Sequence, residues 1–364
     1  MNRGLPTLMT VAMVLLVADC GVVMAMTAHP AIAAVTSAAR IAALCALWSA
    51  LKRRAAPGEH RPSQWWPTAA YAYALVVVFG SAAVAGARNW IWLPTCDGRL
   101  VQSLFVQQMV VVDRGFAAAI GAVIVWACCR AAPPPARPAP ARVPGVWSIA
   151  TLATFSFPLC FIAAEVYIHL VGAQHWCHQL TADALPPAIQ FWTFVASGFE
   201  EELTFTGAAL VLLLGARKPQ LFAVLAVNIA ARMSLHLYYA DHRTVLLWLG
   251  WIVIWSGGGL MVAMAVGRYA VAHGLSRPRF AVAWAVSTAC AHSLSNMFGM
   301  GGRLVLLLAT LLVMAVCAVE MAWRGPRARN MFWWLTPPTG SPGTPDPERE
   351  PIGDAAAAAP EYRE

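Results

Sequence analysis

The stretch LVLLLATLLVMAVCAVEMAW, residues 304–323, contains a single charged side chain, Glu320. About 20 apolar residues of α-helix cross the roughly 30 Å hydrocarbon core of a membrane, so this stretch is long enough to span one. Further runs of this kind lie near residues 7–27, 31–51, 67–87, 108–129, 146–172, 189–214, 220–240, 244–268 and 280–300. The sequence therefore predicts an all-α polytopic membrane protein with about ten transmembrane helices.

The composition excludes a water-soluble protein of this length. Of the 364 residues, 59% are hydrophobic and 12% are charged, and the mean hydropathy is +0.61. Soluble domains contain about 25% charged residues, so most of this chain must lie in lipid. The formal net charge of +8 could suggest nucleic acid, but the basic residues stand between apolar runs, which is the pattern of membrane loops. We therefore expect membrane lipids, and no nucleic acid, as partners.

The positions of the basic residues predict the orientation of the helices. Lys and Arg follow the second, fourth, sixth, eighth and tenth runs, whereas the loops between them contain few. Cytoplasmic loops of membrane proteins carry an excess of Lys and Arg, so with ten spans both termini lie in the cytoplasm. Cys96 and Cys177 fall in loops on the opposite side, where a disulfide and two separate thiols both remain open.

Two polar stretches divide the chain. Residues 131–145 (AAPPPARPAPARVPG) form a Pro-rich linker between an N-terminal four-helix membrane unit, residues 1–130, and a six-helix unit, residues 146–324. Residues 337–364 combine Pro, Gly and an alanine run with six acidic residues against two Arg. They cannot bury enough apolar surface to fold, so we predict a disordered, acidic cytoplasmic tail.

Ionisable side chains inside apolar runs are expensive in lipid and indicate function by default. Three places are nevertheless simplest to interpret as satisfied structural contacts. They are the isolated Asp19, Glu165 with His169 on one helix face, and Glu320 four residues before Arg324.

The sixth run differs because it contains three consecutive carboxylates. FEEELTFTG, residues 199–207, places Glu200, Glu201 and Glu202 among apolar side chains. Three adjacent anions in lipid would cost more than packing can offset, so they must meet water, cations or protons. A carboxylate that exchanges a proton at such a place suits general acid/base chemistry. The run therefore predicts a functional site.

Two other predicted helices carry polar residues that could complete this site. ARMSLHLYY, residues 231–239, contains Arg232 and His236. HSLSN, residues 292–296, begins with His292 and ends with Asn296, which are four residues apart and therefore neighbours on one helix face. Together with the carboxylates, these residues indicate one site in the six-helix unit.

At these residues the sequence resembles the CPBP family of intramembrane endopeptidases, which includes the CAAX prenyl proteases and bacterial immunity-type homologues. The family carries the motifs EExxxR, FxxxH and HxxxN on separate membrane helices. Glu201 and Glu202 match the first motif, His236 the second, and His292 with Asn296 the third. The resemblance covers about residues 195–300. It implies a protein of the bacterial plasma membrane that cleaves a membrane-embedded or lipidated peptide.

The resemblance also implies a role for each matching residue. Glu201 would take a proton from a water molecule that His236 helps to hold, and the water would attack a peptide carbonyl. His292 and Asn296 would donate hydrogen bonds to the developing oxyanion, where donors lower the barrier most. Glu202 would support Glu201 by orienting it.

Two positions depart from the family pattern. Thr206 stands where the first motif has Arg, and Arg232 stands where the second has Phe. We hypothesise that Arg232 supplies the missing charge as a supporting residue. Two His and a Glu could bind zinc, but the HExxH pattern of metalloprotease helices is absent. We therefore expect a reaction without a metal or another cofactor.

Two other functions remain open from the sequence. The Thr206 departure is compatible with a degenerate family member that binds or scaffolds membrane partners without cleaving them. Buried Glu and His residues also occur in proton-coupled transporters. Such folds contain inverted repeats with broken helices, and we find no such repeat in this sequence.

Overall fold

The computed structural model describes residues 4–55, 65–92, 104–132, 143–172, 186–237, 240, 243–325 and 330–335. Within these ranges the regular structure is entirely helical, as predicted. In chain order the elements are α1 (Gly4–Met26), α2 (Pro30–Ala55), α3 (Trp66–Trp92), α4 (Leu104–Ala131), α5 (Val146–Leu170), α7 (Pro187–Glu201), η1 (Glu202–Ala208), α8 (Ala209–Leu213), α9 (Lys218–His236), α10 (Val245–Ile252), η3 (Val253–Gly257), α11 (Gly258–Ala272), α12 (Arg277–Arg324) and η5 (Trp333–Leu335).

The described residues of each of the ten apolar runs are largely helical, in one helix or in consecutive helical segments, which confirms the predicted fold class. Seven helical stretches among the described residues are long and apolar enough to cross a membrane. The last of them, α12, is 48 residues long and contains two of the runs. They are separated at Gly299, where φ is +57°, a backbone conformation that favours glycine. Two of the ten runs are not among these seven stretches. The first extends from α7 to α8 and contains the carboxylates, and the second lies in α9 and contains Arg232.

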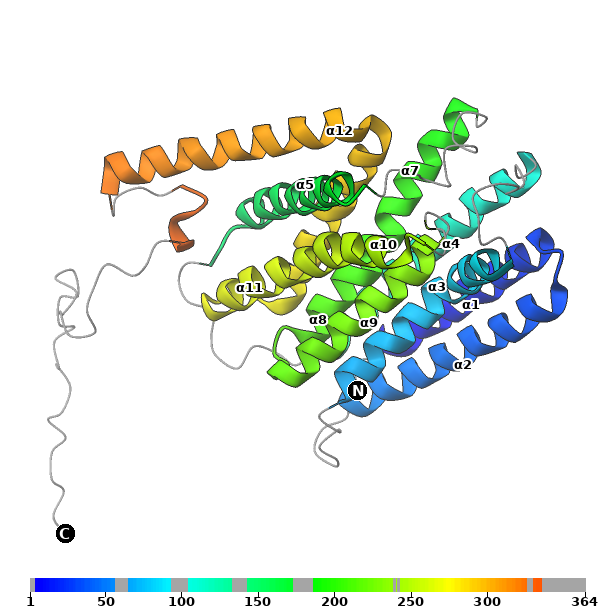
Figure 1. The fold of residues 1–364 in the computed structure, drawn as a ribbon. Coiled ribbons are helices and arrows are strands. Elements are labelled where there is room, and N and C mark those ends of the chain that lie inside the picture. Colours follow the sequence, from blue (N-terminus) through cyan, green and yellow to red (C-terminus); the bar gives the residue numbers. More distant parts are fainter. Residues whose placement is uncertain are drawn as a thin grey trace, which may run out of the picture.

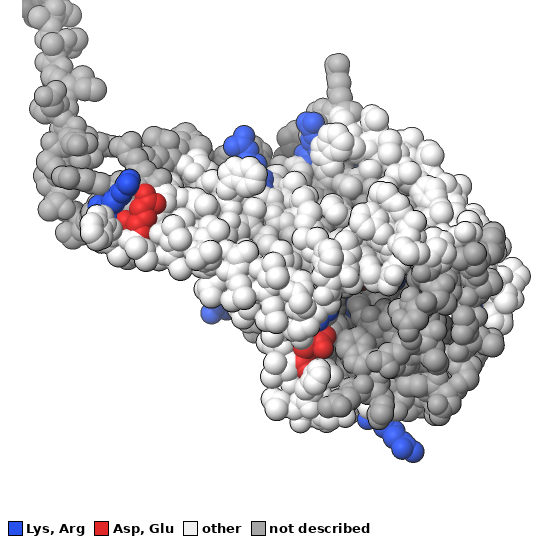
Figure 2. Space-filling view, turned by 90° about the horizontal axis from the view of Figure 1, so that it is seen from above, with Lys and Arg blue, Asp and Glu red and all other residues white. Residues whose placement is uncertain are grey.

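The surface of the described chain is apolar where lipid would lie. Beyond Gly299, α12 exposes side chains such as Leu308, Leu312 and Val319. Figure 2 shows a face on which charged side chains appear at only a few points. So much exposed apolar area is unfavourable in water but not in lipid, and the chain is therefore an integral membrane protein.

Several predictions concern residues outside the described ranges. The central part of the linker, residues 133–142, the tail from residue 336 onward, and both Cys96 and Cys177 belong to this group. The side of the membrane on which each terminus lies also stays a prediction.

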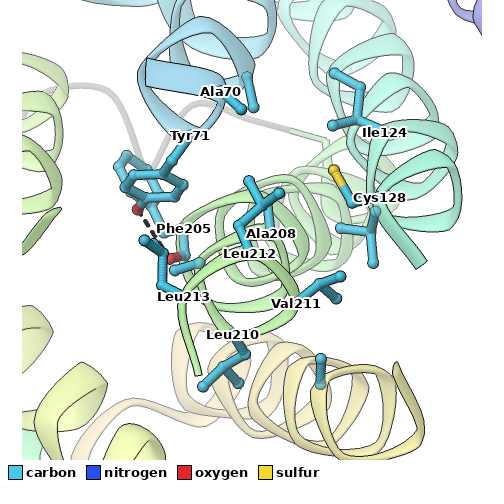
Figure 3. Packing of buried hydrophobic residues seen from close by; sticks show 14 of the residues in the cluster. Ala70, Tyr71, Ile124, Cys128, Phe205, Ala208, Leu210, Val211, Leu212 and Leu213 are labelled. Atoms are coloured by element: carbon cyan, nitrogen blue, oxygen red, sulfur yellow. Dashed lines mark hydrogen bonds between the residues drawn. The ribbon is translucent and has the colours of Figure 1, made fainter. Parts of the chain in front are cut away.

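The two halves of the sequence share one apolar core. In Figure 1, α1 to α4 lie together on one side, α7 to α9 run beside them, and α5 with α10 to α12 lie on the other side. Tyr71 and Ile124 from the first half and Phe205, Leu210 and Trp284 from the second belong to one cluster of buried residues. Figure 3 shows part of this packing around η1 and α8. The linker therefore divides the sequence but not the packing.

Two membrane helices widen locally into π-helical turns. One is η1, between α7 and α8, and the other is η3, between α10 and α11. A π-turn is rare and is often found at functional sites, because it re-aims side chains within an otherwise regular helix. The turn η1 contains Glu202 and Thr206, and Trp255 of η3 lies beside Arg232.

Candidate active site

The predicted residues come from three neighbouring helical segments. Glu201 ends α7 and Glu202 begins η1, while His236 ends α9. His292 and Asn296 lie on the first half of α12, before the break at Gly299. The helices α7 and α12 approach closely at Gly198, where an added Cβ would come within 2.3 Å of Ser293 Oγ. This contact positions His292 opposite the carboxylates.

Arg232 joins the two carboxylates of the first motif. Its Nη2 lies 2.7 Å from Glu202 Oε1, and its Nη1 lies 3.3 Å from Glu201 Oε2. The guanidinium carbon is 4.5 Å from the ring centroids of both Phe205 and Trp255. A planar guanidinium can make these ion pairs and stack on aromatic rings at the same time. Arg232 therefore supplies the charge that the first motif lacks at Thr206.

Glu202 accepts a hydrogen bond on each of its two carboxylate oxygens. Besides Arg232, the hydroxyl of Thr206 donates to its Oε2 at 2.6 Å, and Nδ1 of His292 lies 3.3 Å from its Oε1. By contrast, no hydrogen bond to Glu201 Oε1 is present among the described residues. Glu201 is therefore the carboxylate with an oxygen available for a water molecule.

A contact with the backbone indicates which ring nitrogen of His236 carries the proton. Its Nδ1 lies 2.8 Å from the backbone oxygen of Arg232. A carbonyl oxygen only accepts, so we assign the proton to Nδ1, which leaves Nε2 as the accepting nitrogen. His236 and His292 both stand edge-on to Trp255, with ring centroids 5.6 and 5.5 Å away. Trp255, on η3, is thus a common wall for the two histidines.

Asn296 lies at the margin of the cluster. Its Nδ2 donates to Ser197 Oγ at 3.1 Å. Ser197 lies on α7, about one helical turn before Glu201. The side chain is half-buried, whereas Glu201, Glu202, Arg232, His236 and His292 are all buried. The structure thus brings Glu201, Glu202, Arg232 and His292 into direct contact, buries His236 against Trp255, and places Asn296 at the margin.

A small cavity of about 20 Å³ adjoins the cluster. Glu202, Thr206, Arg232, Trp255 and Ser256 are among its lining residues. This volume is close to the minimum that holds one water molecule, and the lining offers several polar partners. The cavity therefore gives room for one water molecule beside Glu202, and Glu201 is not among its lining residues; it has no space for a peptide in this conformation.

A buried hydrogen-bond network supports the π-turn. Tyr71 Oη donates to the backbone oxygen of Phe205 at 2.9 Å, as Figure 3 shows. Asn228 Nδ2 donates to Tyr71 Oη at 2.7 Å and to the same Phe205 oxygen at 3.2 Å. Ser256 Oγ donates to Asn228 Oδ1 at 2.6 Å. The sequence analysis missed these residues, although Asn228 is a strongly polar residue in an apolar run.

Replacement of Tyr71 by Phe should destabilise the protein by about 1–3 kcal/mol, because it leaves a buried carbonyl and a buried amide with fewer partners. The loss would appear as a lower midpoint of unfolding in mild detergent. Tyr73→Phe is the matched control, since Tyr73 is on the same helix but is 36% exposed. Equal midpoints for the two variants would contradict a structural role of the network.

The predicted structural contacts of the other ionisable residues are also present. Asp19 forms an ion pair with Arg40 of α2, and Glu165 lies 3.5 Å from Arg303. Nδ1 of His169 lies 2.8 Å from the backbone oxygen of Glu165. At the surface, Glu320 and Arg324 are 3.4 Å apart.

No family model, no curated protein and no solved structure matches this chain. The resemblance to the CPBP family therefore rests on the three sequence motifs alone.

The residues do not form an evident zinc site. Among the described residues, no three His, Cys, Asp or Glu side chains are grouped as a metal ion would require. Instead of converging on an open position, Glu202 binds Arg232 and Thr206, and His236 Nδ1 binds a backbone oxygen. No step of the chemistry below is assigned to a metal.

Proposed function

We propose that this protein is an intramembrane endopeptidase that hydrolyses a peptide bond of a membrane-embedded or lipidated substrate. The proposal depends on one observation, the buried pair of carboxylates that both contact Arg232. In this pair, Glu201 Oε1 accepts no hydrogen bond from the described residues. The three-motif resemblance supports the same reaction class. We further propose that the protein lies in a bacterial plasma membrane with both termini in the cytoplasm.

The first chemical step is the activation of water. Glu201 Oε1 takes a proton from a water molecule, and His236 Nε2 accepts a hydrogen bond from the same water. The water oxygen forms a bond to the carbonyl carbon of the substrate, and the carbonyl oxygen becomes an oxyanion. When the carbon–nitrogen bond breaks, the proton held by Glu201 passes to the leaving amine. The products are a carboxylic acid and an amine, which ionise to a carboxylate and an ammonium group.

The oxyanion needs hydrogen-bond donors on the opposite side. Nδ1 of His292 lies 3.3 Å from Glu202 Oε1, so Nε2 is the nitrogen left for a substrate oxygen, and it can donate to the oxyanion only when it carries a ring proton. Asn296 Nδ2 uses one proton for Ser197 and has a second one to donate. Loss of one such donor commonly lowers the rate by about 10²–10³.

The proposal can be tested by isotope labelling. The purified protein is reconstituted in lipid vesicles with membrane-anchored or lipidated peptides in water enriched in ¹⁸O. Hydrolysis places one ¹⁸O atom in the new carboxyl group, and mass spectrometry of the products detects it. We expect this label in the presence of a strong chelator as well.

Two results would contradict the proposal. Peptides that are recovered intact outside the vesicles would favour a binding or scaffolding protein. Peptides that are recovered intact inside the vesicles would favour a transporter. Loss of cleavage in the chelator, with recovery on addition of zinc, would overturn the metal-free reaction.

A further inference from the structure

Two guanidinium groups lie on the turn that joins α8 to α9. Arg268, on α11, donates from Nη2 to the backbone oxygen of Ala216 at 2.8 Å. The guanidinium of Arg277, at the start of α12, lies against Gly215, where an added Cβ would come within 2.4 Å of Nη2 and 2.7 Å of Cζ. Gly215 and Ala216 are consecutive residues, so two helices that lie far along the chain bring positive charge to one short turn.

Two more basic residues follow the same turn. Arg217 directly precedes α9 and Lys218 is its first residue, and both side chains are exposed. The helices α9 and α12 both begin at this place, and the first turn of a helix carries partial positive charge from its backbone N–H groups. The helix starts therefore add to the positive potential of the side chains.

These charges have no carboxylate partner in the part of the chain that the structure describes. None of the ion pairs found there includes Arg217, Lys218, Arg268 or Arg277. Positive charges that are held close together repel one another, so an anion that binds between them is favoured. Guanidinium groups bind phosphate oxygens through pairs of N–H donors, which makes a phosphate group the anion that fits best.

Apolar surface adjoins the basic turn. Phe222 lies four residues after Lys218 on α9, so the two side chains are neighbours on one helix face. The ring of Phe222 is 72% exposed. The turn also joins two apolar runs, which places it at the level of the lipid headgroups. A phospholipid can contact the basic residues with its phosphate and Phe222 with an acyl chain, whereas a free phosphate ion uses the charges alone.

We propose that the turn between α8 and α9 binds the phosphate group of an anionic phospholipid, with Arg268 and Arg277 as its main ligands. Gly215 belongs to this site, because the absence of a side chain there leaves the space that the Arg277 guanidinium occupies. The distribution of basic residues predicts that the site lies on the cytoplasmic side. The proposal does not require the protein to be a peptidase.

Native mass spectrometry tests the proposal by counting bound lipids. The purified protein in mild detergent is titrated with phosphatidylglycerol, which is anionic, or with phosphatidylcholine, which has no net charge. We expect the wild-type protein to bind phosphatidylglycerol more tightly. Arg277→Gln and Gly215→Ala should each weaken this binding about fivefold, the usual effect of one basic side chain near a membrane surface. Gly215→Ala is the sharper variant, since it displaces the guanidinium without changing the net charge.

The matched control is Arg279→Gln, which removes an exposed positive charge about 200° around α12 from Arg277 and should leave the affinity unchanged. Equal affinities of the wild-type protein for the two lipids would overturn the proposal, and this measurement requires no variant to fold. Wild-type affinity in Gly215→Ala would also contradict it, because general positive charge would then explain the binding. Displacement of the lipid by inorganic phosphate at equal concentration would assign the site to a soluble anion instead.

Discussion

Glu201→Gln should lower the rate of peptide cleavage by about 10²–10⁴, which is the usual contribution of a general base. The amide has nearly the shape of the carboxylate but cannot take a proton from water. The contact of Glu201 with Arg232 is 3.3 Å long, and Glu202 retains its own 2.7 Å contact with the same guanidinium. The substitution should therefore remove activity while the fold is kept. The measurement is the cleavage rate of a substrate found by the isotope experiment.

The control for this prediction is Glu320→Gln, the same chemical change in a pair whose Glu side chain is 34% exposed. Its cleavage rate should equal that of the wild type. If Glu201→Gln also cleaves at the wild-type rate, Glu201 is not the base. The same substitution at Glu202, which lines the cavity, would then be the next test.

Arg232→Met should destabilise the protein by about 3–5 kcal/mol, the usual cost of breaking a buried ion pair. Methionine keeps much of the apolar packing against Phe205 and Trp255, so the loss reports mainly on charge. Without the guanidinium, Glu201 and Glu202 remain buried with no positive partner of comparable strength. Unfolding in mild detergent by titration with a denaturing detergent would measure the change.

Two further variants make this prediction specific. Arg324→Met removes an exposed partner of Glu320 and should cost less than about 1 kcal/mol. Combining Arg232→Met with Gln at both positions 201 and 202 removes the uncompensated charges and should recover part of the lost stability. A midpoint for Arg232→Met equal to that of the wild type would contradict the role assigned to the clamp.

Part of the candidate site could be predicted from local sequence. Three adjacent Glu residues in an apolar run are unusual enough to indicate a site without knowledge of the fold. Arg232 was also assigned as the substitute for the missing motif Arg, and the structure places it against both carboxylates. In a membrane such inference is strong, because a charge in lipid requires a partner and few candidates exist.

Other parts of the site could not be predicted in this way. Tyr71 contacts the backbone of Phe205, 134 residues further along the chain. Arg40 lies in an apolar run where nothing local relates it to Asp19, its ion-pair partner. The preference for Glu201 over Glu202 as the base depends on which oxygens already accept hydrogen bonds, and this is a property of the folded site.

Hydropathy and residue pattern were sufficient to predict an all-α membrane protein, the positions of its helices and the unusual run of carboxylates. Hydropathy and helix length are local quantities, and lipid makes them decisive because every backbone group must be satisfied within its own helix. The packing of the helices adds that the N-terminal helices share a core with the rest, that π-turns contribute Glu202 and Trp255 to the site, and that Glu202 rather than Glu201 has both oxygens occupied. These features depend on contacts between residues far apart in the chain, and their energies arise only when the helices pack together.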